Sequence, residues 1–423
     1  MTQQKKNYAL PIIMMILLFG MISFVTNLAA PMGVVVKGQF QASNFMGMLG
    51  NFANFAAYAF MGIPAGILLK KIGYKSTALI AIAVGFFGIL VQFLSGTIGS
   101  FPVYLIGAFI SGFSMCMLNT VVNPMLNTLG GGGKKGNQLI QIGGTFNSLM
   151  ATLVPVLVGI LVGQVTRETA ITNVNPVLFI AMGIFATVGI VLFFVQIPEP
   201  HIKKASSIKY EHSPWAFRHF ILGTVAIFVY VGIEVGVPGT MNLFLTDPQG
   251  FGGSAAEAGL VTGTYWFLML IGRFLGASFG AKISSKAMLT FASSLAVLLV
   301  LGAIFLPTTT LIDMPVFKSD LSFGMAQVPI NAMLLVLVGL CTSIMWGGIF
   351  NLAVEGLGKY TEAATGIFMV MVCGGGILPL IQNYVADVAN FMSSYWVIIA
   401  ALAFLLYYAI SGCKNVNKDI PVE

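Results

Sequence analysis

The sequence predicts an all-α integral membrane protein with twelve transmembrane helices in two pseudo-symmetric six-helix bundles. The first observation is composition, since 57% of the 423 residues are hydrophobic and 8% are charged. Soluble domains have about 45–50% apolar and about 25% charged residues, so this chain could not bury its apolar surface in water. The second is size, because twelve spans of roughly 20 residues match this apolar content. A soluble enzyme, a disulfide scaffold and a disordered chain are excluded.

Twelve apolar runs follow one another along the chain, and each can cross about 30 Å of hydrocarbon as a helix. The runs cover residues 9–31, 45–69, 76–96, 101–126, 138–163, 174–196, 219–245, 256–280, 287–306, 330–353, 363–386 and 392–412. The first run follows a short basic tail and lacks a small-residue cleavage site, so we interpret it as a span and not as a signal peptide.

The positions of lysine and arginine predict the orientation of these spans. With both termini inside, 17 of the 20 basic residues lie in inner segments, and Lys37, Arg167 and Lys318 lie outside. Cytoplasmic loops of membrane proteins carry such an excess. We therefore expect a multi-pass protein in the bilayer of the bacterial inner membrane, with both termini in the cytoplasm. The net charge of +7 reflects this topology and not a nucleic-acid partner.

A polar connection divides the chain into two sets of six spans. We predict an N-terminal bundle at residues 1–197, a cytoplasmic linker at 198–218 and a C-terminal bundle at 219–423. Two parallel halves around a central path, with the substrate near the midplane, are typical of major facilitator transporters. The prediction is therefore a transporter in which the two bundles alternate around one site.

A weak internal repeat closes the second span of each half and places glycines and cations on the inner loop between spans two and three. It consists of PAGILLKKIGYKS (64–76) and GRFLGASFGAKISSK (272–286). We expect these cations to set topology and to hold an inner gate rather than to contact substrate. The expected gate and topology residues are Lys70, Lys71, Lys75, Arg273 and Lys282.

Signatures of enzymes and metal sites are absent from the sequence. GGGGKKG (130–136) resembles a phosphate loop, but no Ser or Thr follows the lysine and no strand precedes it. The four cysteines share no CxxC spacing, and no histidine lies at mid-membrane depth. We expect neither catalysis nor a metal site, and no cofactor apart from a coupling ion.

Glu234 is the one acidic residue that the span boundaries place in the middle of a membrane helix, in FVYVGIEVGVPG (228–239). A centred carboxylate costs about 2.5–3.5 kcal/mol on insertion scales, so it should face a partner or water. We predict that Glu234 contacts the substrate and carries the coupling ion, either a proton or sodium. A structural glutamate that holds two helices together is the alternative.

Asparagines recur within the spans, and an amide offers two donors and an acceptor without charge. These residues are Asn27, Asn51, Asn54, Asn119, Asn123, Asn147, Asn242, Asn351 and Asn383. Such chemistry suits a neutral polyol such as a sugar. The alternative for each is a hydrogen bond between helices, worth about 0.6 kcal/mol on average.

Two tryptophans inside spans supply ring faces that can stack on a sugar. Trp346 is followed by Gly347 and Gly348, which allow close approach of a ligand or a helix. Packing is the alternative for each ring. The predicted substrate site comprises Asn27, Asn51, Asn54, Asn119, Asn123, Asn147, Glu234, Trp266, Trp346 and Asn351.

Six motifs spread over both halves are similar to those of one transporter family. They are IPAGILLKKIGYK (63–75), TVVNP (120–124), TFNS (145–148), YVGIE (230–234), GRF (272–274) and GGGI (374–377). Together they resemble the fucose–galactose–glucose proton symporter family of the major facilitator superfamily. The resemblance covers nearly the whole chain and implies a sugar symporter that alternates between inward-open and outward-open states.

The resemblance also implies roles for particular positions. The asparagine of the TFNS-like motif contacts sugar in the family, which implies that role for Asn147. The fucose-type members carry an aspartate where this chain has Asn27 and a glutamate where it has Asn119. Neither amide can titrate, so the fucose-type proton path does not transfer to this chain, and Glu234 is left as the titratable group at depth.

The function predicted from sequence is secondary active import of a neutral, hexose-like sugar by alternating access, coupled to a proton or sodium gradient. An uncoupled sugar facilitator is the first alternative, because two acids of the family are amides here. A membrane sugar sensor without transport is the second. The expected partners are the sugar and the lipid bilayer, and we expect a monomer.

Overall fold

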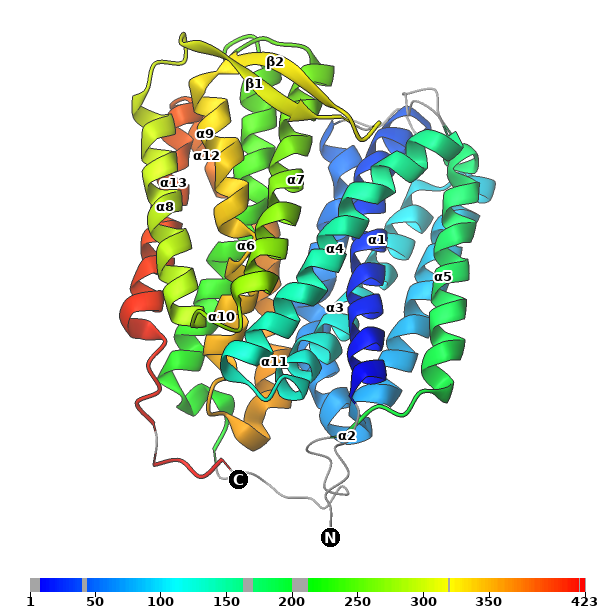
Figure 1. The fold of residues 1–423 in the computed structure, drawn as a ribbon. Helices are drawn as coiled ribbons and strands as arrows, with labels where there is room; N and C mark the ends of the chain where they lie inside the picture. The colour runs from blue at the N-terminus through cyan, green and yellow to red at the C-terminus, as the bar shows by residue number, and fades with distance from the viewer. Residues whose placement is uncertain are drawn as a thin grey trace.

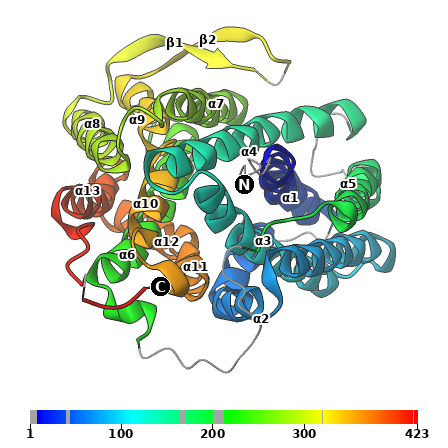
Figure 2. The same cartoon turned by 60° about the horizontal axis from the view of Figure 1, so that its bottom comes forward.

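The computed structural model describes residues 8–39, 44–162, 170–199, 212–318, 320–417 and 419–422. Long helices dominate these residues and form two bundles, α1–α5 and α6–α13, which lie side by side (Figure 1, Figure 2). Helix α1 begins, and α13 ends, at one end of the molecule, which we name the inner end. The opposite end, which carries a small β-hairpin, is named the outer end (Figure 1).

The N-terminal bundle contains six membrane-crossing segments in five helices. Its helices are α1 (Ala9–Gln39), α2 (Asn44–Ile98), α3 (Phe101–Leu129), α4 (Gly133–Val162) and α5 (Asn175–Phe194). Helix α2 crosses twice, because Gly73 has φ 89° and ψ 176° and divides it into two helical segments. A positive φ of this kind is readily adopted only by glycine.

The C-terminal bundle also contains six crossings, two of which are interrupted. Its helices are α6 (Arg218–Thr246), α7 (Ala255–Phe279), α8 (Ser285–Phe305), α9 (Ile330–Thr342), α10 (Met345–Val354), α11 (Thr361–Val370), α12 (Gly374–Val388) and α13 (Phe391–Tyr407). Helices α9 and α10 share one crossing, and α11 and α12 share another. By length and hydropathy the described residues contain ten candidate spans, one of which is the double-length Phe52–Ile98. With that segment counted twice and α4 added, the structure has the twelve crossings that the sequence predicts.

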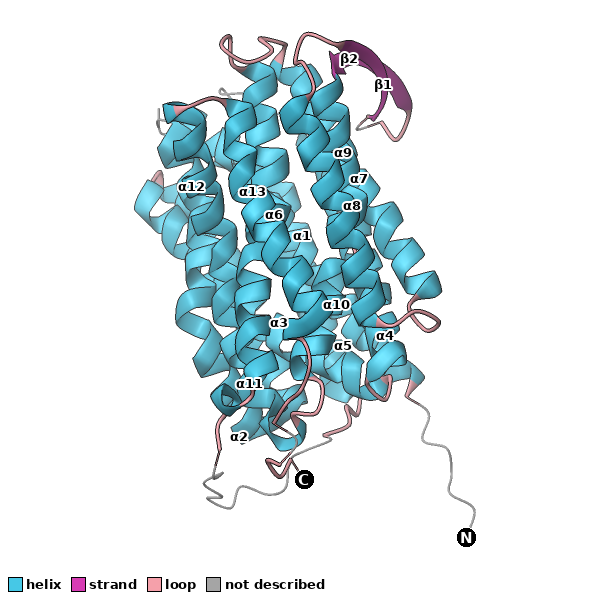
Figure 3. Ribbon diagram, turned by 90° about the vertical axis from the view of Figure 1, so that its left-hand side faces the viewer, coloured by secondary structure: helices cyan, strands magenta, loops and turns pink. Residues whose placement is uncertain are grey.

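A β-hairpin between α8 and α9 was not foreseen from the sequence. Strands β1 (Leu311–Phe317) and β2 (Phe323–Pro329) pair antiparallel, with Met314 opposite Ala326. Alternate residues are buried toward the helices, whereas the other face is exposed at the outer end (Figure 3). At the tip, Ser322 donates to the Asp320 carboxylate from its amide (3.0 Å) and its hydroxyl (2.6 Å), which lowers the pKa of that carboxyl.

The hairpin is attached to α7. The backbone N–H of Phe317 donates to the Thr264 hydroxyl at 2.9 Å. The rings of Phe267 and Phe317 stack with centroids 4.2 Å apart and an interplanar angle of 6°. These contacts fix the hairpin to the C-terminal bundle.

The inner ends of the two bundles pack against each other. Gly66 on α2 faces Gly366 on α11 so closely that a Cβ atom at Gly66 would lie 2.9 Å from the Gly366 Cα. Helix α4 contacts α7 and α10 through a row of polar side chains that is described below. The structure therefore holds the inner side closed between the bundles.

Candidate functional site

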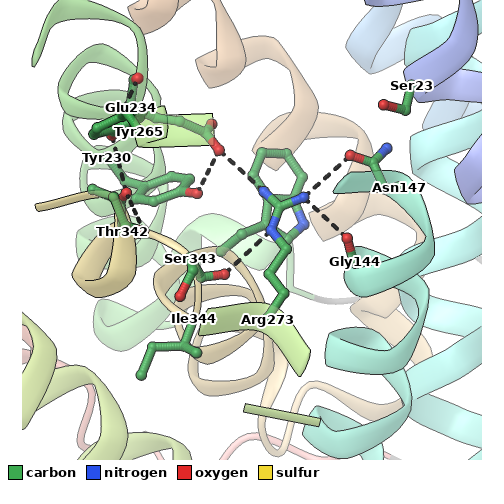
Figure 4. Close-up of polar contacts among 12 residues, drawn as sticks. Ser23, Gly144, Asn147, Tyr230, Glu234, Tyr265, Arg273, Thr342, Ser343 and Ile344 are labelled. Carbon is green, nitrogen blue, oxygen red and sulfur yellow. Dashed lines mark hydrogen bonds and ion pairs between the residues drawn. The ribbon is translucent and has the colours of Figure 1, made fainter. Parts of the chain in front are cut away.

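Arg273 lies at the centre of the polar contacts between the two bundles (Figure 4). Its Nη2 is 3.1 Å from Oε1 of Glu234, and its Nε donates to the Ser343 carbonyl at 3.3 Å. Its Nη1 donates to Asn147 Oδ1 at 3.1 Å and to the Gly144 carbonyl at 3.2 Å. Glu234 and Ser343 belong to the C-terminal bundle, whereas Gly144 and Asn147 lie on α4. One guanidinium thus bridges both halves of the molecule.

Glu234 is held by neighbours from its own bundle. The phenol of Tyr230, one turn earlier on α6, donates to Oε1 at 2.9 Å. Pro238 has no N–H, so the Glu234 carbonyl lacks its usual helical partner, and the Tyr265 hydroxyl lies 3.4 Å from it. The side chains of Glu234 and Arg273 are only 15% and 12% exposed. The charge pair is therefore nearly enclosed, with the two charges compensating each other.

Asn147 is oriented by contacts on both sides of its amide. It lies near the middle of α4, where its Nδ2 donates to the Phe19 carbonyl of α1 at 2.9 Å. This bond directs Oδ1 toward Arg273. The position implied for sugar contact by the family resemblance is thus the place where the N-terminal bundle meets the charge pair.

A second polar connection crosses between the bundles from α3 to α10. The indole N–H of Trp346 donates to Oδ1 of Asn123 at 3.0 Å. On α3, the amide of Asn123 bonds the Asn119 carbonyl at 2.9 Å, and Asn119 in turn donates to the Tyr58 hydroxyl of α2 at 2.9 Å. The ring of Trp346 packs edge-to-face on Tyr230, with centroids 6.2 Å apart. Because Tyr230 bonds Glu234, the two connections join.

The remaining predicted site residues lie in varied surroundings. Asn27 donates to Ser23 of its own helix, at 2.9 Å to the carbonyl and 3.0 Å to the hydroxyl. Asn54 has a buried amide oxygen without a hydrogen-bond partner among the described residues. The side chain of Asn51 lies outside the described part of the structure. Asn351 is buried and donates to Ser285 at 2.9 Å, a contact between α10 and α8 near the inner end.

Trp266 is 37% exposed and packs edge-to-face on Tyr265, with ring centroids 5.3 Å apart. It precedes Arg273 by seven residues, so both side chains leave α7 on nearly the same face. Trp266 therefore lies about two turns, or roughly 10 Å, toward the outer end from the charge pair.

A row of hydrogen bonds closes the inner side beneath this cluster, and we name it the inner ladder. Its residues on α4 are Lys134, Gln138, Gln141, Gly144 and Asn147, spaced by three or four along one helix face. Their partners in the C-terminal bundle are the Lys282 carbonyl at 3.1 Å, the Ala277 carbonyl at 3.0 Å, the Ile344 carbonyl at 2.9 Å and, for the last two residues, Arg273. Arg273 and Asn147 form the rung nearest the middle of the membrane.

The lysines expected at the inner gate lie at the inner end. Lys75 donates to the Phe193 carbonyl at 2.7 Å, within the N-terminal bundle. Lys282 contributes its carbonyl, and not its ammonium group, to the inner ladder. Lys71 is exposed, and Lys70 lies one turn along α2 from the Gly66–Gly366 contact. Arg273, which the sequence placed with these loop cations, instead extends into the protein beside Glu234.

Comparison with known proteins places this architecture in a family. The profile of the Major Facilitator Superfamily matches residues 12–380. The chain is 30% identical to a glucose/galactose transporter of Brucella abortus biovar 1 (strain 9-941), over 98% of this chain and 97% of the relative. The chain belongs to the Major Facilitator Superfamily. Membership in this transporter family agrees with the prediction that the protein is not an enzyme.

More distant matches agree on the fold. The chain is 22% identical to the L-fucose-proton symporter of Escherichia coli (strain K12), over 97% of this chain and 94% of the relative. The solved structure of the superfamily transporter FucP in the outward conformation matches with a TM-score of 0.79 at 21% identity, covering 95% of this chain and 98% of that one. The resemblance that the sequence motifs indicated is confirmed.

The sequence analysis did not identify several residues of this site. Gln138 and Gln141 were not singled out, although their spacing from Lys134 already places them on one helix face. The pairing of Arg273 with Glu234 was missed because GRF was placed with an inner loop. The available signal was its distance from the end of the span, since six helical residues follow Arg273 before α7 ends at Phe279.

Proposed function

We propose that this chain imports a neutral, hexose-like sugar across the bacterial inner membrane by alternating access of its two bundles. The names of two relatives refer to sugars, since one is a glucose/galactose transporter and the other is an L-fucose-proton symporter. The observation that carries the proposal is the polar cluster between the bundles, in which amides, a phenol and an indole from both halves converge. Such groups can bond the hydroxyls of a sugar and stack on its ring.

The charge balance of the cluster favours a neutral substrate. Glu234 and Arg273 form an ion pair with a separation of 3.1 Å, so their charges offset each other. An anionic sugar would have to displace the carboxylate from Arg273, and a cation would have to displace the guanidinium from Glu234. A neutral polyol can use the free hydrogen-bonding capacity around the pair without either displacement.

The substrate site that we propose keeps the residues predicted from the sequence, with Asn123, Asn147, Glu234 and Trp346 at its centre. We propose Glu234 as the group that carries the coupling ion, either a proton or sodium. The proposed bundles are 1–197 and 219–423, joined by a cytoplasmic linker at 198–218. The proposed state in the bilayer is a monomer with both termini in the cytoplasm.

Uptake of a panel of labelled sugars into proteoliposomes tests this function. The purified chain is reconstituted and given an inward proton gradient, an inward sodium gradient, or neither. Accumulation of a hexose above equilibrium under one gradient is the expected result and names the ion. Failure to take up any neutral sugar under all three conditions would refute the proposal.

An uncoupled facilitator is the second candidate, and the amides at Asn27 and Asn119 favour it. Both amides use their donors within the N-terminal bundle, toward Ser23 and Tyr58. In the same proteoliposomes a facilitator would equilibrate the sugar at equal rates with and without an ion gradient.

A further inference from the structure

An apolar groove runs along the flank of the N-terminal bundle, between the second segment of α2 and α5. Its volume is about 620 Å³, and its walls are formed by residues within 79–87 and 185–194 that are all apolar or glycine. Figure 2 shows α5 on the side of the N-terminal bundle that faces away from α6–α13. The groove therefore lies apart from the central path, and its walls offer no side chain that could bond a sugar hydroxyl.

Small residues form the floor of this groove, and larger rings border it. Ala83, Ala186 and Gly189 contribute little side-chain volume. A Cβ atom at Gly189 would lie 3.1 Å from Cγ2 of Ile82, so the two helices approach each other closely beneath the groove. At the border, Phe194 is 78% exposed. Apolar side chains this exposed on a membrane span are stable in contact with hydrocarbon and not with water.

The length of the groove matches the inner leaflet of a bilayer. Its walls extend from Leu79 to Phe87 on α2 and from Phe185 to Phe194 on α5. These stretches are about 12–14 Å long at 1.5 Å per helical residue. One leaflet contributes about 15 Å to the hydrocarbon core. Because Leu79 and Phe194 lie toward the inner end, an acyl chain can fill the groove with its headgroup at the inner surface.

A cation lies at the inner mouth of the groove. The Lys75 ammonium is 5.9 Å from the ring centroid of Phe193, a residue of the groove wall, and donates to the Phe193 carbonyl at 2.7 Å. An ammonium group has three donors, and this contact uses one of them. The Glu199 carboxylate accepts from the backbone N–H groups of Tyr74 at 2.9 Å and Lys75 at 3.1 Å. Lys71 is a second exposed cation on the same connection, so cations outnumber the described carboxylate there.

We propose that this groove binds an anionic glycerophospholipid of the inner leaflet, with one acyl chain along α2 and α5 and the phosphate at Lys75. Dispersion contacts with five phenylalanine rings hold the chain, and the ammonium group attracts the phosphate. A zwitterionic headgroup carries its own cation, which Lys71 and Lys75 repel, so a net negative headgroup is preferred. This binding does not depend on which solute the chain transports.

Photolabelling locates the lipid on the full chain. The protein is reconstituted in phosphatidylcholine vesicles that contain a small fraction of phosphatidylglycerol with a diazirine on one acyl chain. After illumination the labelled residues are mapped by mass spectrometry. Labels should concentrate within 79–87 and 185–194, and excess unlabelled phosphatidylglycerol should suppress them. Labels spread evenly over the lipid-facing surfaces of both bundles would overturn the inference.

Ala186→Phe tests the groove itself. Ala186 is an exposed residue of the groove wall, so the added ring fills the groove without entering the packed core. The labels within 79–87 and 185–194 should then be lost. Ala400→Phe, at an exposed position of α13 in the other bundle, is the matched control and should retain them. Labelling that persists in the Ala186 variant would contradict the proposed site.

Lys75→Gln tests the headgroup contact. Loss of one cation near the membrane surface should lower labelling of the groove by about fivefold, and Lys75→Arg should restore it. The same diazirine chain on phosphatidylcholine should label the groove about fivefold less than on phosphatidylglycerol. Equal labelling by both lipids, with no effect of Lys75→Gln, would refute the proposed headgroup site.

Native mass spectrometry separates the lipid from a second copy of the chain, which is the other occupant that an apolar flank could take. The wild-type monomer should retain phosphatidylglycerol after its release from detergent, and Ala186→Phe should lose it. A wild-type dimer that Ala186→Phe dissociates would assign the groove to association between copies and overturn the inference.

Discussion

Arg273 and Asn147 meet across the boundary between the two bundles, with Nη1 of the guanidinium 3.1 Å from the amide oxygen. The same guanidinium nitrogen also bonds the Gly144 carbonyl, one turn toward the inner end. Asn147 is thus both the last rung of the inner ladder and a proposed sugar contact. Substrate binding and closure of the inner gate would therefore compete for one amide oxygen.

Replacing Asn147 should impair both roles. Asn147→Ala leaves one Arg273 N–H without its acceptor across the bundle boundary, at a cost of about 1–3 kcal/mol to the closed inner side. We expect sugar uptake in proteoliposomes to fall by about tenfold or more. The control is Asn242→Ala, which removes an amide contact to Thr262 inside the C-terminal bundle. Equal losses in both variants would contradict the special position of Asn147.

Trp346→Phe tests the second connection between the bundles. The change keeps a ring against Tyr230 but removes the indole N–H that Asn123 accepts. The Asn123 side chain is fully buried, so its oxygen becomes an unpaired buried acceptor, costing about 1–3 kcal/mol. We expect KM for the sugar to rise at least about fivefold. Trp396→Phe, on a ring that is 46% exposed, is the matched control and should leave KM unchanged.

Gly66→Ala should keep the inner ends apart. The added methyl carbon would lie 2.9 Å from the Gly366 Cα and 3.1 Å from the Glu362 carbonyl, and backbone atoms cannot move aside as flexible side chains can. The expected result is faster labelling of a cysteine at the inner gate by a membrane-impermeant maleimide added from the inner side. Gly259→Ala meets no atom within 4 Å and should behave as the wild type. Unchanged labelling of the Gly66 variant would show that this contact does not close the gate.

Phe317→Ala should loosen the outer hairpin without affecting the polar cluster. The variant loses the stacked contact with Phe267, worth about 0.5–1.5 kcal/mol beyond the area it buries. Hydrogen exchange of residues 311–329 should become faster, while sugar uptake stays near the wild-type rate. Protection equal to that of the wild type would mean that the strand pairing alone holds the hairpin in place.

Much of the architecture follows from hydropathy and charge. Long apolar runs cannot avoid the membrane, so the twelve crossings were predictable, including the two that Gly73 separates within α2. The need of Glu234 for a partner was also predictable, because a carboxylate far from either end of a membrane span is costly when it is unpaired. The identity of that partner was not, since span boundaries are uncertain by several residues and the length of an arginine side chain adds to the uncertainty in depth.

The hairpin was not predicted from the sequence, for a different reason. Its strands alternate between exposed and buried residues, a period-two pattern that is weak beside the long apolar runs on either side.

The contacts of Asn123 and Asn351 could not be distinguished from the sequence either. Both are buried asparagines in spans, yet one accepts from the opposite bundle and the other bonds a neighbouring helix. Only the rotation of each helix in the bundle decides this, and the sequence does not specify it.

The attachment of the outer hairpin to α7 has a practical consequence for imaging. A hydrogen bond and a ring stack join β1 to the helix that carries Arg273. An antibody fragment raised against the exposed face of the strands would therefore be a rigid fiducial on the C-terminal bundle, outside the lipid disc. Particle alignment on that fragment would leave any rotation of the other bundle directly visible in the averaged maps.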